Sequence, residues 1–265
     1  MEQIFLLKLI LSFIIGGAWI TYATVVAEKC GTKLGGIIAG LPSTALITFF
    51  FIGWTQSTNA AAEATTLSPL IGAVIYLSML VYLSLVRKIN FWLALGSLLL
   101  VWFVLSLGVY STDFRSFWIS MIVLVFVLIV SYYVLEKVLK IKSESKRKLK
   151  HTLPMLLFRG SMTGIIIAIA VLLAKVSGPV LGGVFAMFPA AFLGTIIVTH
   201  FAHGKDFSSA VMKVAILTGV SVIAFVVFVR FSFVPLGLIL GTIVSLLGSW
   251  LIGYGVHLFV KKKMI

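Results

Sequence analysis

Charged residues are scarce in this sequence. Only 11% of its 265 residues are charged, whereas 61% are hydrophobic, and the mean hydropathy is +1.21. A soluble domain carries about 25% charged residues, because its surface must be solvated by water. This scarcity excludes an ordinary soluble protein and predicts a chain that lies within a membrane.

Acidic residues and cysteine are rarer still. The chain has 7 Asp and Glu against 21 Lys and Arg, and Cys30 is its single cysteine. One cysteine excludes a disulfide within the chain and a four-cysteine metal site. The sequence also lacks an HExxH motif, a Cys/His cluster with metal-ligand spacing and a glycine-rich phosphate loop. We therefore expect no enzyme activity, no metal and no cofactor.

Long apolar runs, by contrast, are abundant. A helix needs about 20 apolar residues to cross a hydrocarbon core of about 30 Å. This length predicts an all-α, polytopic protein with about nine transmembrane helices. The predicted spans lie near residues 4–27, 34–54, 68–86, 91–110, 117–136, 153–175, 180–200, 208–230 and 234–260. The run at 4–27 is too long for the apolar part of a secretory signal, so we expect it to be a retained span.

The chain contains an internal repeat. The pattern Leu-Gly-Gly-x-x-Ala-x-x-Pro runs from Leu34 to Pro42 and recurs, without gaps, from Leu181 to Pro189, 147 positions later (189 minus 42). Chance matches occur in glycine-rich helices, but a motif shared at one fixed offset predicts a duplication. We expect a first membrane repeat of about five spans at 1–140, a basic cytoplasmic linker at 141–152, and a second repeat of about four spans at 153–265.

Lysine and arginine are distributed unevenly between the two sides of these spans. Most of them fall on one side, including Arg87, Lys88 and the run from Lys140 to Lys150. Cytoplasmic loops carry the positive excess, which predicts a cell-membrane protein with its N-terminus outside and its C-terminus in the cytoplasm. Beside membrane spans, the basic run favours anionic lipid headgroups over nucleic acid. Since five spans precede the second copy, we expect the repeats to be inverted in topology.

Two proline-interrupted helices predict a binding site. Pro42 and Pro189 each lie about seven residues into a span, or about 10 Å deep, and enter from opposite faces. Proline breaks a helix, and the N–H groups freed at the start of the next segment attract anionic or polar groups. The predicted substrate-binding residues are Gly35, Gly36, Pro42, Ser43, Thr44 and Thr48 in the first copy, Gly182, Gly183, Pro189 and Thr195 in the second, and the cations Lys8 and Arg159.

Each of these features also has a simpler interpretation. Small residues four apart, such as Gly36 and Gly40, are a common means of packing membrane helices together. Lys8 and Arg159 lie close enough to span ends to reach the headgroups instead. His200 and His203 sit near a span end, where histidines are typical interfacial residues but can also carry protons.

The repeated motif resembles a known family. Gly182 to Ala190, and its counterpart Gly35 to Ser43, are similar to segments of the small four-helix GlpM-like membrane proteins and related domains of unknown function. The resemblance implies that one such unit is duplicated here, although the extra span of the first half departs from a simple doubling. It also implies a link to exopolysaccharide production or envelope homeostasis.

Inverted repeats and paired broken helices together favour a secondary transporter or exporter. We expect it to move a small anionic or polar solute by alternating access at a midplane site, with membrane lipids as its other partners. Two further hypotheses remain open. One is a non-transporting integral membrane subunit that forms an oligomer along its glycine faces. The other is a flippase for lipids or lipid-linked sugars, which would have a lateral groove open to the bilayer.

Overall fold

The computed structural model describes residues 2–29, 42–112, 114–141 and 152–263. All regular secondary structure in these segments is helical. Six helical stretches are long and apolar enough to cross a membrane, and the apolar helix Ser43–Thr55 is shorter. Such helices are typical of an integral membrane protein.

The first part of the chain forms seven described helices, three of which begin at a side-chain cap. They are α1 (Glu2–Lys29), α3 (Ser43–Thr55), α4 (Thr58–Ala64), α5 (Ser68–Leu85), α6 (Phe91–Ser111) and α7 (Phe117–Tyr133), which continues as the π-helical η1 (Val134–Val138). The side chains of Ser57, Asn90 and Ser116 accept hydrogen bonds from backbone N–H groups at the starts of α4, α6 and α7. These caps satisfy N–H groups that the helix itself leaves without partners.

The second part consists of α8 (Leu153–Val176), α9 (Pro179–Ala186), α10 (Ala190–Thr218) and α11 (Val220–Lys263). Two of these helices change direction at a glycine: Gly204 in α10 has φ 87° and Gly237 in α11 has φ 74°. Glycine adopts positive φ without the steric penalty of a Cβ. At about 1.5 Å per residue, α11 would otherwise extend to about 66 Å, roughly twice the hydrocarbon thickness.

Five predicted spans agree with described helices to within two residues at each end, namely 4–27, 68–86, 91–110, 117–136 and 153–175. The later boundaries differ from the prediction. The segment 180–200 is divided between α9 and α10, and the loops expected near 201–207 and 231–233 are replaced by the kinks at Gly204 and Gly237. A single glycine is sufficient to redirect the chain, so both segments remain helical on either side of the kink.

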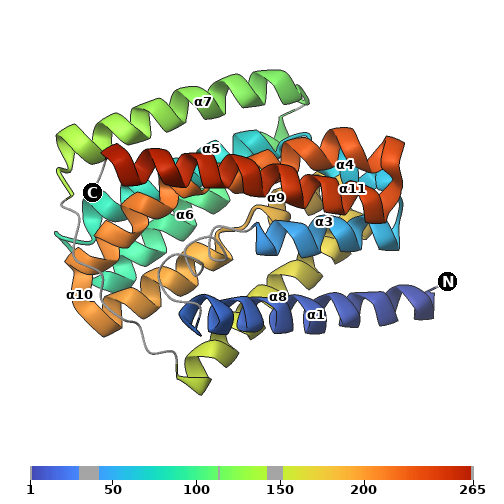
Figure 1. The fold of residues 1–265 in the computed structure, drawn as a ribbon, viewed down its shortest axis with the longest axis horizontal. Helices are drawn as coiled ribbons and strands as arrows, with labels where there is room; N and C mark the ends of the chain where they lie inside the picture. The colour runs from blue at the N-terminus through green and yellow to red at the C-terminus, as the bar shows by residue number, and fades with distance from the viewer. Residues whose placement is uncertain (1, 30–41, 113, 142–151, 264–265) are drawn as a thin grey trace.

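The stretch formed by α4 and α5 lies at the centre of the molecule. In Thr58–Leu85, 78% of the most apolar window is buried, compared with 17% in the α1 stretch. Helix α5 packs against α6 and α7, while α11 packs against α3 and α4 (Figure 1). The N-terminal end of α1 and the C-terminal end of α11 lie at opposite ends of the molecule (Figure 1).

Helices α1 and α8 form the closest helix pair, and they run in opposite directions. Gly17 lies against the backbone of Gly160, and Phe13 lies against Gly164, so residue numbers fall along α8 as they rise along α1. A Cβ added to Gly17 would be 2.9 Å from the Gly160 carbonyl oxygen. The small residues therefore permit the backbones to touch, as is common in membrane helix pairs.

Candidate functional site

The first predicted break lies at the start of α3. Pro42 is buried and precedes the first helical residue, Ser43, and the Pro42 carbonyl accepts a hydrogen bond from the Leu46 N–H at 2.7 Å. Among the described residues, no side chain caps this helix end. The Thr44 hydroxyl is buried and has no hydrogen-bond partner in the described part of the chain. The start of α3 therefore presents one buried hydroxyl group, that of Thr44, for which the described residues supply no partner.

The second break has the same local geometry. Helix α9 ends at Ala186, α10 begins at Ala190, and the Pro189 carbonyl accepts from the Leu193 N–H at 2.9 Å. A proline cannot donate the missing hydrogen bond, so the helix stops and restarts.

Threonines follow both breaks at the same distance. The Thr48 hydroxyl donates to the Thr44 carbonyl at 2.8 Å, and the Thr195 hydroxyl donates to the Ala191 carbonyl at 2.8 Å. Each hydroxyl thus uses its proton within its own helix and keeps lone pairs to accept one further hydrogen bond.

The predicted binding-site glycines near Pro189, Gly182 and Gly183, pack against other helices. Gly182 lies against Ala170 and Ala174 of α8, and Gly183 lies against the Ala64 carbonyl at the end of α4. Their lack of a Cβ is what permits these contacts. The corresponding Gly35 and Gly36 lie outside the described residues.

Arg159 of α8 lies beside the second break. A Cβ added to Gly194, one turn into α10, would be 3.3 Å from Arg159 Cγ and 3.4 Å from Nε. Arg159 is half-buried, and it forms no hydrogen bond or ion pair with the described residues. A cation without a partner beside the start of a helix is a suitable environment for an anion.

The structure does not bring Lys8 to either break. Its ammonium group donates to the Trp54 carbonyl at 2.7 Å and lies 4.8 Å from the centre of the Trp54 ring. Trp54 is in the last turn of α3, about 18 Å along the helix from Pro42 at 1.5 Å per residue. Lys8 therefore stabilises the negative end of α3, a role that the sequence did not reveal.

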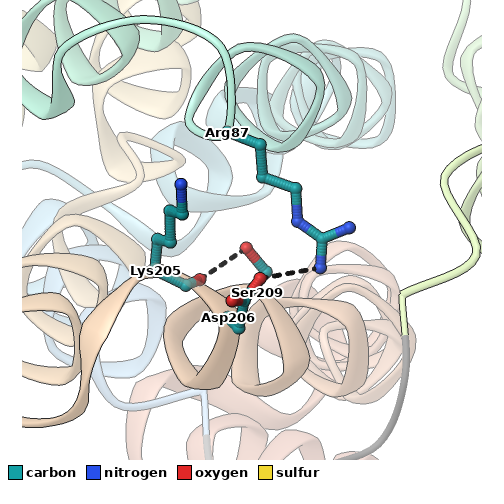
Figure 2. Close-up of polar contacts among 4 residues, drawn as sticks. All are labelled: Arg87, Lys205, Asp206 and Ser209. Carbon is teal, nitrogen blue, oxygen red and sulfur yellow. Dashed lines mark hydrogen bonds and ion pairs between the residues drawn. The ribbon is translucent and has the colours of Figure 1, made fainter.

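The turn of α10 at Gly204 contacts the connection between α5 and α6. Figure 2 shows Arg87 reaching Asp206, with 3.1 Å between the guanidinium and carboxylate groups. In the same view, the Ser209 hydroxyl donates to the Lys205 carbonyl at 2.7 Å. The ion pair joins the first part of the chain to the second.

An aromatic contact lies next to this ion pair. The ring of His200 stacks on Phe91, with 4.0 Å between ring centres and an interplanar angle of 26°. At the opposite end of the molecule, Gly53 lies against Leu238. The sequence identifies His200 only as a span-end residue. A sequence signal was present: the counterpart of His200 at the 147-residue offset is Gly53, so a histidine occupies only one of the two corresponding positions.

These features describe an all-helical membrane protein with two helices that begin at buried prolines. Residues 9–115 match a family described as protein of unknown function (DUF3147). This match covers less than half of the chain and extends from α1 to just beyond α6. Neither the curated proteins nor the solved structures contain a match to this chain. The resemblance to the GlpM-like proteins remains a prediction.

Proposed function

We propose that this protein is a secondary transporter or exporter that moves a small anionic or polar solute by alternating access. In this proposal its two halves are inverted repeats, and the solute binds between the helix starts at Pro42 and Pro189. Two similar halves of opposite orientation can exchange conformations and expose one site to each side of the membrane in turn.

The helix boundaries support a repeat offset of 147 residues over most of both halves. Helices α3, α4 and α6 begin at Ser43, Thr58 and Phe91. Their counterparts at this offset are Ala190, where α10 begins, and Lys205 and Leu238, which follow the kinks at Gly204 and Gly237. The offset was found in a short motif, whereas these boundaries extend well beyond it.

The observation that carries the proposal is that contacts between the halves occur in reciprocal pairs. Gly17 contacts Gly160. At the 147-residue offset, the counterpart of Gly17 is Gly164 and the counterpart of Gly160 is Phe13. Gly164 and Phe13 are also in contact. A twofold relation between two halves produces such exchanged pairs, whereas chance packing does not.

Two further pairs of contacts follow the same rule. Gly72 of α5 lies against Ile223 of α11, and Gly219 lies near the Tyr76 hydroxyl. Gly53 contacts Leu238, and their counterparts at the same offset, His200 and Phe91, also contact each other. Since these contacts involve four helix pairs, namely α1–α8, α5–α11, α3–α11 and α6–α10, they support a pseudo-twofold axis for the two repeats.

Helix α7 explains how two similar halves have opposite orientations. It lies outside the repeat and between its copies, so it adds one crossing before the second copy begins. This arrangement supports the proposal of about nine spans, with a proline break entering from each face. The proposed orientation, N-terminus outside, rests on the excess of Lys and Arg at the other face.

The proposed solute class rests on Arg159 and the two helix starts. Helix N-termini carry a partial positive charge, and Arg159 adds a full one beside the second break. Thr44, Thr48 and Thr195 supply hydroxyl groups close to the breaks. Together these groups favour a solute that accepts hydrogen bonds and carries negative charge.

A ligand screen followed by a transport assay tests this proposal. The purified protein would be heated with phosphate, sulfate, small carboxylates, amino acids and sugars over a concentration series. A ligand present at about 100 times its dissociation constant stabilises the folded state by about 2.7 kcal/mol, which is a measurable shift in Tm. We expect a saturable shift from an anionic class, and uptake of that solute into proteoliposomes.

The variants for this assay are Pro42→Ala/Pro189→Ala and, separately, Arg159→Gln. Both should lose most uptake while remaining folded, since they restore the broken helices or remove the cation. Pro154→Ala is the matched control, because Pro154 is exposed in the first turn of α8. Undiminished uptake by the folded double variant contradicts the proposal, as does a response to lipid headgroups alone.

A further inference from the structure

His200 of α10 and Phe91, the first residue of α6, are in contact at one end of the molecule. Phe201 and Trp92 extend this contact, with ring centres 5.8 Å apart. The exchanged contact at the other end is formed by Gly53 and Leu238, neither of which titrates. The two ends of the molecule therefore differ in one chemical respect: a histidine occupies one contact and a glycine occupies the other.

His200 is half-buried and lies near several charged groups. Its Nδ1 atom is buried and has no hydrogen-bond partner among the described residues. Lys205 acts on it electrostatically from beyond the turn, and His203 and Asp206 lie on the same helix. The connection between α5 and α6, which precedes Phe91, carries two further cations, Arg87 and Lys88.

The carboxylate of Asp206 is paired with Arg87 at 3.1 Å and offsets the charge of that residue, so the positive charge of Lys205 remains near His200. A proton added to His200 would therefore place a second charge near Lys205. It would also leave a buried N–H group or charge without an acceptor. Both penalties disappear when the ring separates from Phe91 and meets water.

We propose that His200 is a proton-binding residue whose protonation opens the contact with Phe91, so that the transport cycle is coupled to protons at this face. This inference rests on the proposed function for its role in transport, but the opening itself is a property of the fold. Histidine changes its charge near neutral pH, within the range that a cell experiences. Since Gly53 cannot titrate, the response is confined to one end of the molecule.

A thiol-accessibility experiment tests the opening without any solute. In the full chain with Cys30→Ser, Ile196→Cys places a thiol at a buried position of α10 one turn before His200, and Lys137→Cys, at an exposed position, gives the reference rate at each pH. The protein would be reconstituted in nanodiscs and treated with a small charged methanethiosulfonate. The measured quantity is the ratio of the two rates between about pH 8 and pH 5.5, on either side of the histidine range.

We expect this ratio to rise about tenfold on acidification, the effect if the open form binds the proton about ten times more tightly than the closed form. His200→Gln and His200→Phe should abolish the rise, and the phenylalanine variant retains the ring stack if glutamine perturbs folding. His203→Gln is the matched control, because His203 packs on Phe207 of its own helix. It should preserve the rise.

The outcomes separate this inference from the proposed function. A ratio that does not change with pH, or a rise that persists in both folded His200 variants, overturns the inference even if solute uptake is found. A rise that depends on His200 supports it even if no solute is transported, and in that case only the proposed function fails.

Discussion

Lys213 forms the most buried ion pair among the described residues. Its ammonium group lies 2.8 Å from the Glu136 carboxylate and donates to the Ile141 carbonyl at 2.9 Å. Only 6% of the Lys213 side chain and 30% of that of Glu136 are exposed. The pair joins η1, at the end of α7, to α10.

Removing one partner of this pair should destabilise the protein. We expect Lys213→Met to cost about 3 kcal/mol, because it leaves the Glu136 carboxylate partly buried and unpaired. Replacing both residues, in Lys213→Met/Glu136→Leu, should recover most of this loss. The measurement is the Tm of each purified variant in detergent.

The exposed pair of Arg87 and Asp206 provides the control for this prediction. Its side chains are 39% and 59% exposed, so Arg87→Met should cost less than about 1 kcal/mol. Equal Tm losses for Lys213→Met and Arg87→Met would contradict the assigned difference in burial.

Two charged residues, Lys8 and Arg159, show what could not be predicted from the sequence. Lys8 and Arg159 were predicted together as guides for a solute, because both lie inside the first helix of a repeat. The structure places Arg159 beside α10 but binds Lys8 to the end of α3. Depth in a span can be estimated from a sequence, whereas the neighbouring helix that a side chain meets depends on packing.

At the scale of helices, glycines have unequal roles. Gly17 and Gly164 lie where the backbones of α1 and α8 touch, whereas a Cβ added to Gly96 or Gly108 of α6 would meet no described atom within 4 Å. All four are glycines within apolar helices, so composition alone does not distinguish them.

A larger side chain should therefore be harmful only at the helix crossing. We expect Gly17→Val and Gly164→Val each to cost about 1–3 kcal/mol, since an added group would meet the backbone of the facing helix. Gly96→Val and Gly108→Val should change stability little. Thermal unfolding and size-exclusion profiles of the four variants test this difference, and a comparable loss at Gly96 would refute the assigned contacts.

The helix starts after Pro42 and Pro189 belong to the same scale, and the sequence predicts both, although the segment expected to precede Pro42 lies outside the described residues. Proline interrupts a helix through its own covalent structure, so the effect is local. The kinks at Gly204 and Gly237 were not predicted, because glycine permits a turn without requiring one. Neighbouring helices decide which glycines are used in this way.

At the scale of the whole molecule, the proposed topology can be tested directly. In the Cys30→Ser background, Ser111→Cys at the end of α6 should react with an impermeant maleimide added to intact cells. Lys88→Cys, before the start of α6, should react only after permeabilisation, because positively charged connections face the cytoplasm. Reaction of both from the same side would contradict a transmembrane α6, and the reverse pattern would contradict the proposed orientation.

The sequence by itself determined that this chain forms apolar helices of membrane-spanning length and that helices begin directly after Pro42 and Pro189, whereas the concentration of positive charge on one side of a membrane stays a prediction. These properties follow from local composition and covalent geometry. Only the tertiary structure decided that Gly17 meets Gly160 and that His200 meets Phe91. Such contacts join residues far apart in the chain, and they depend on how all the helices fill space together.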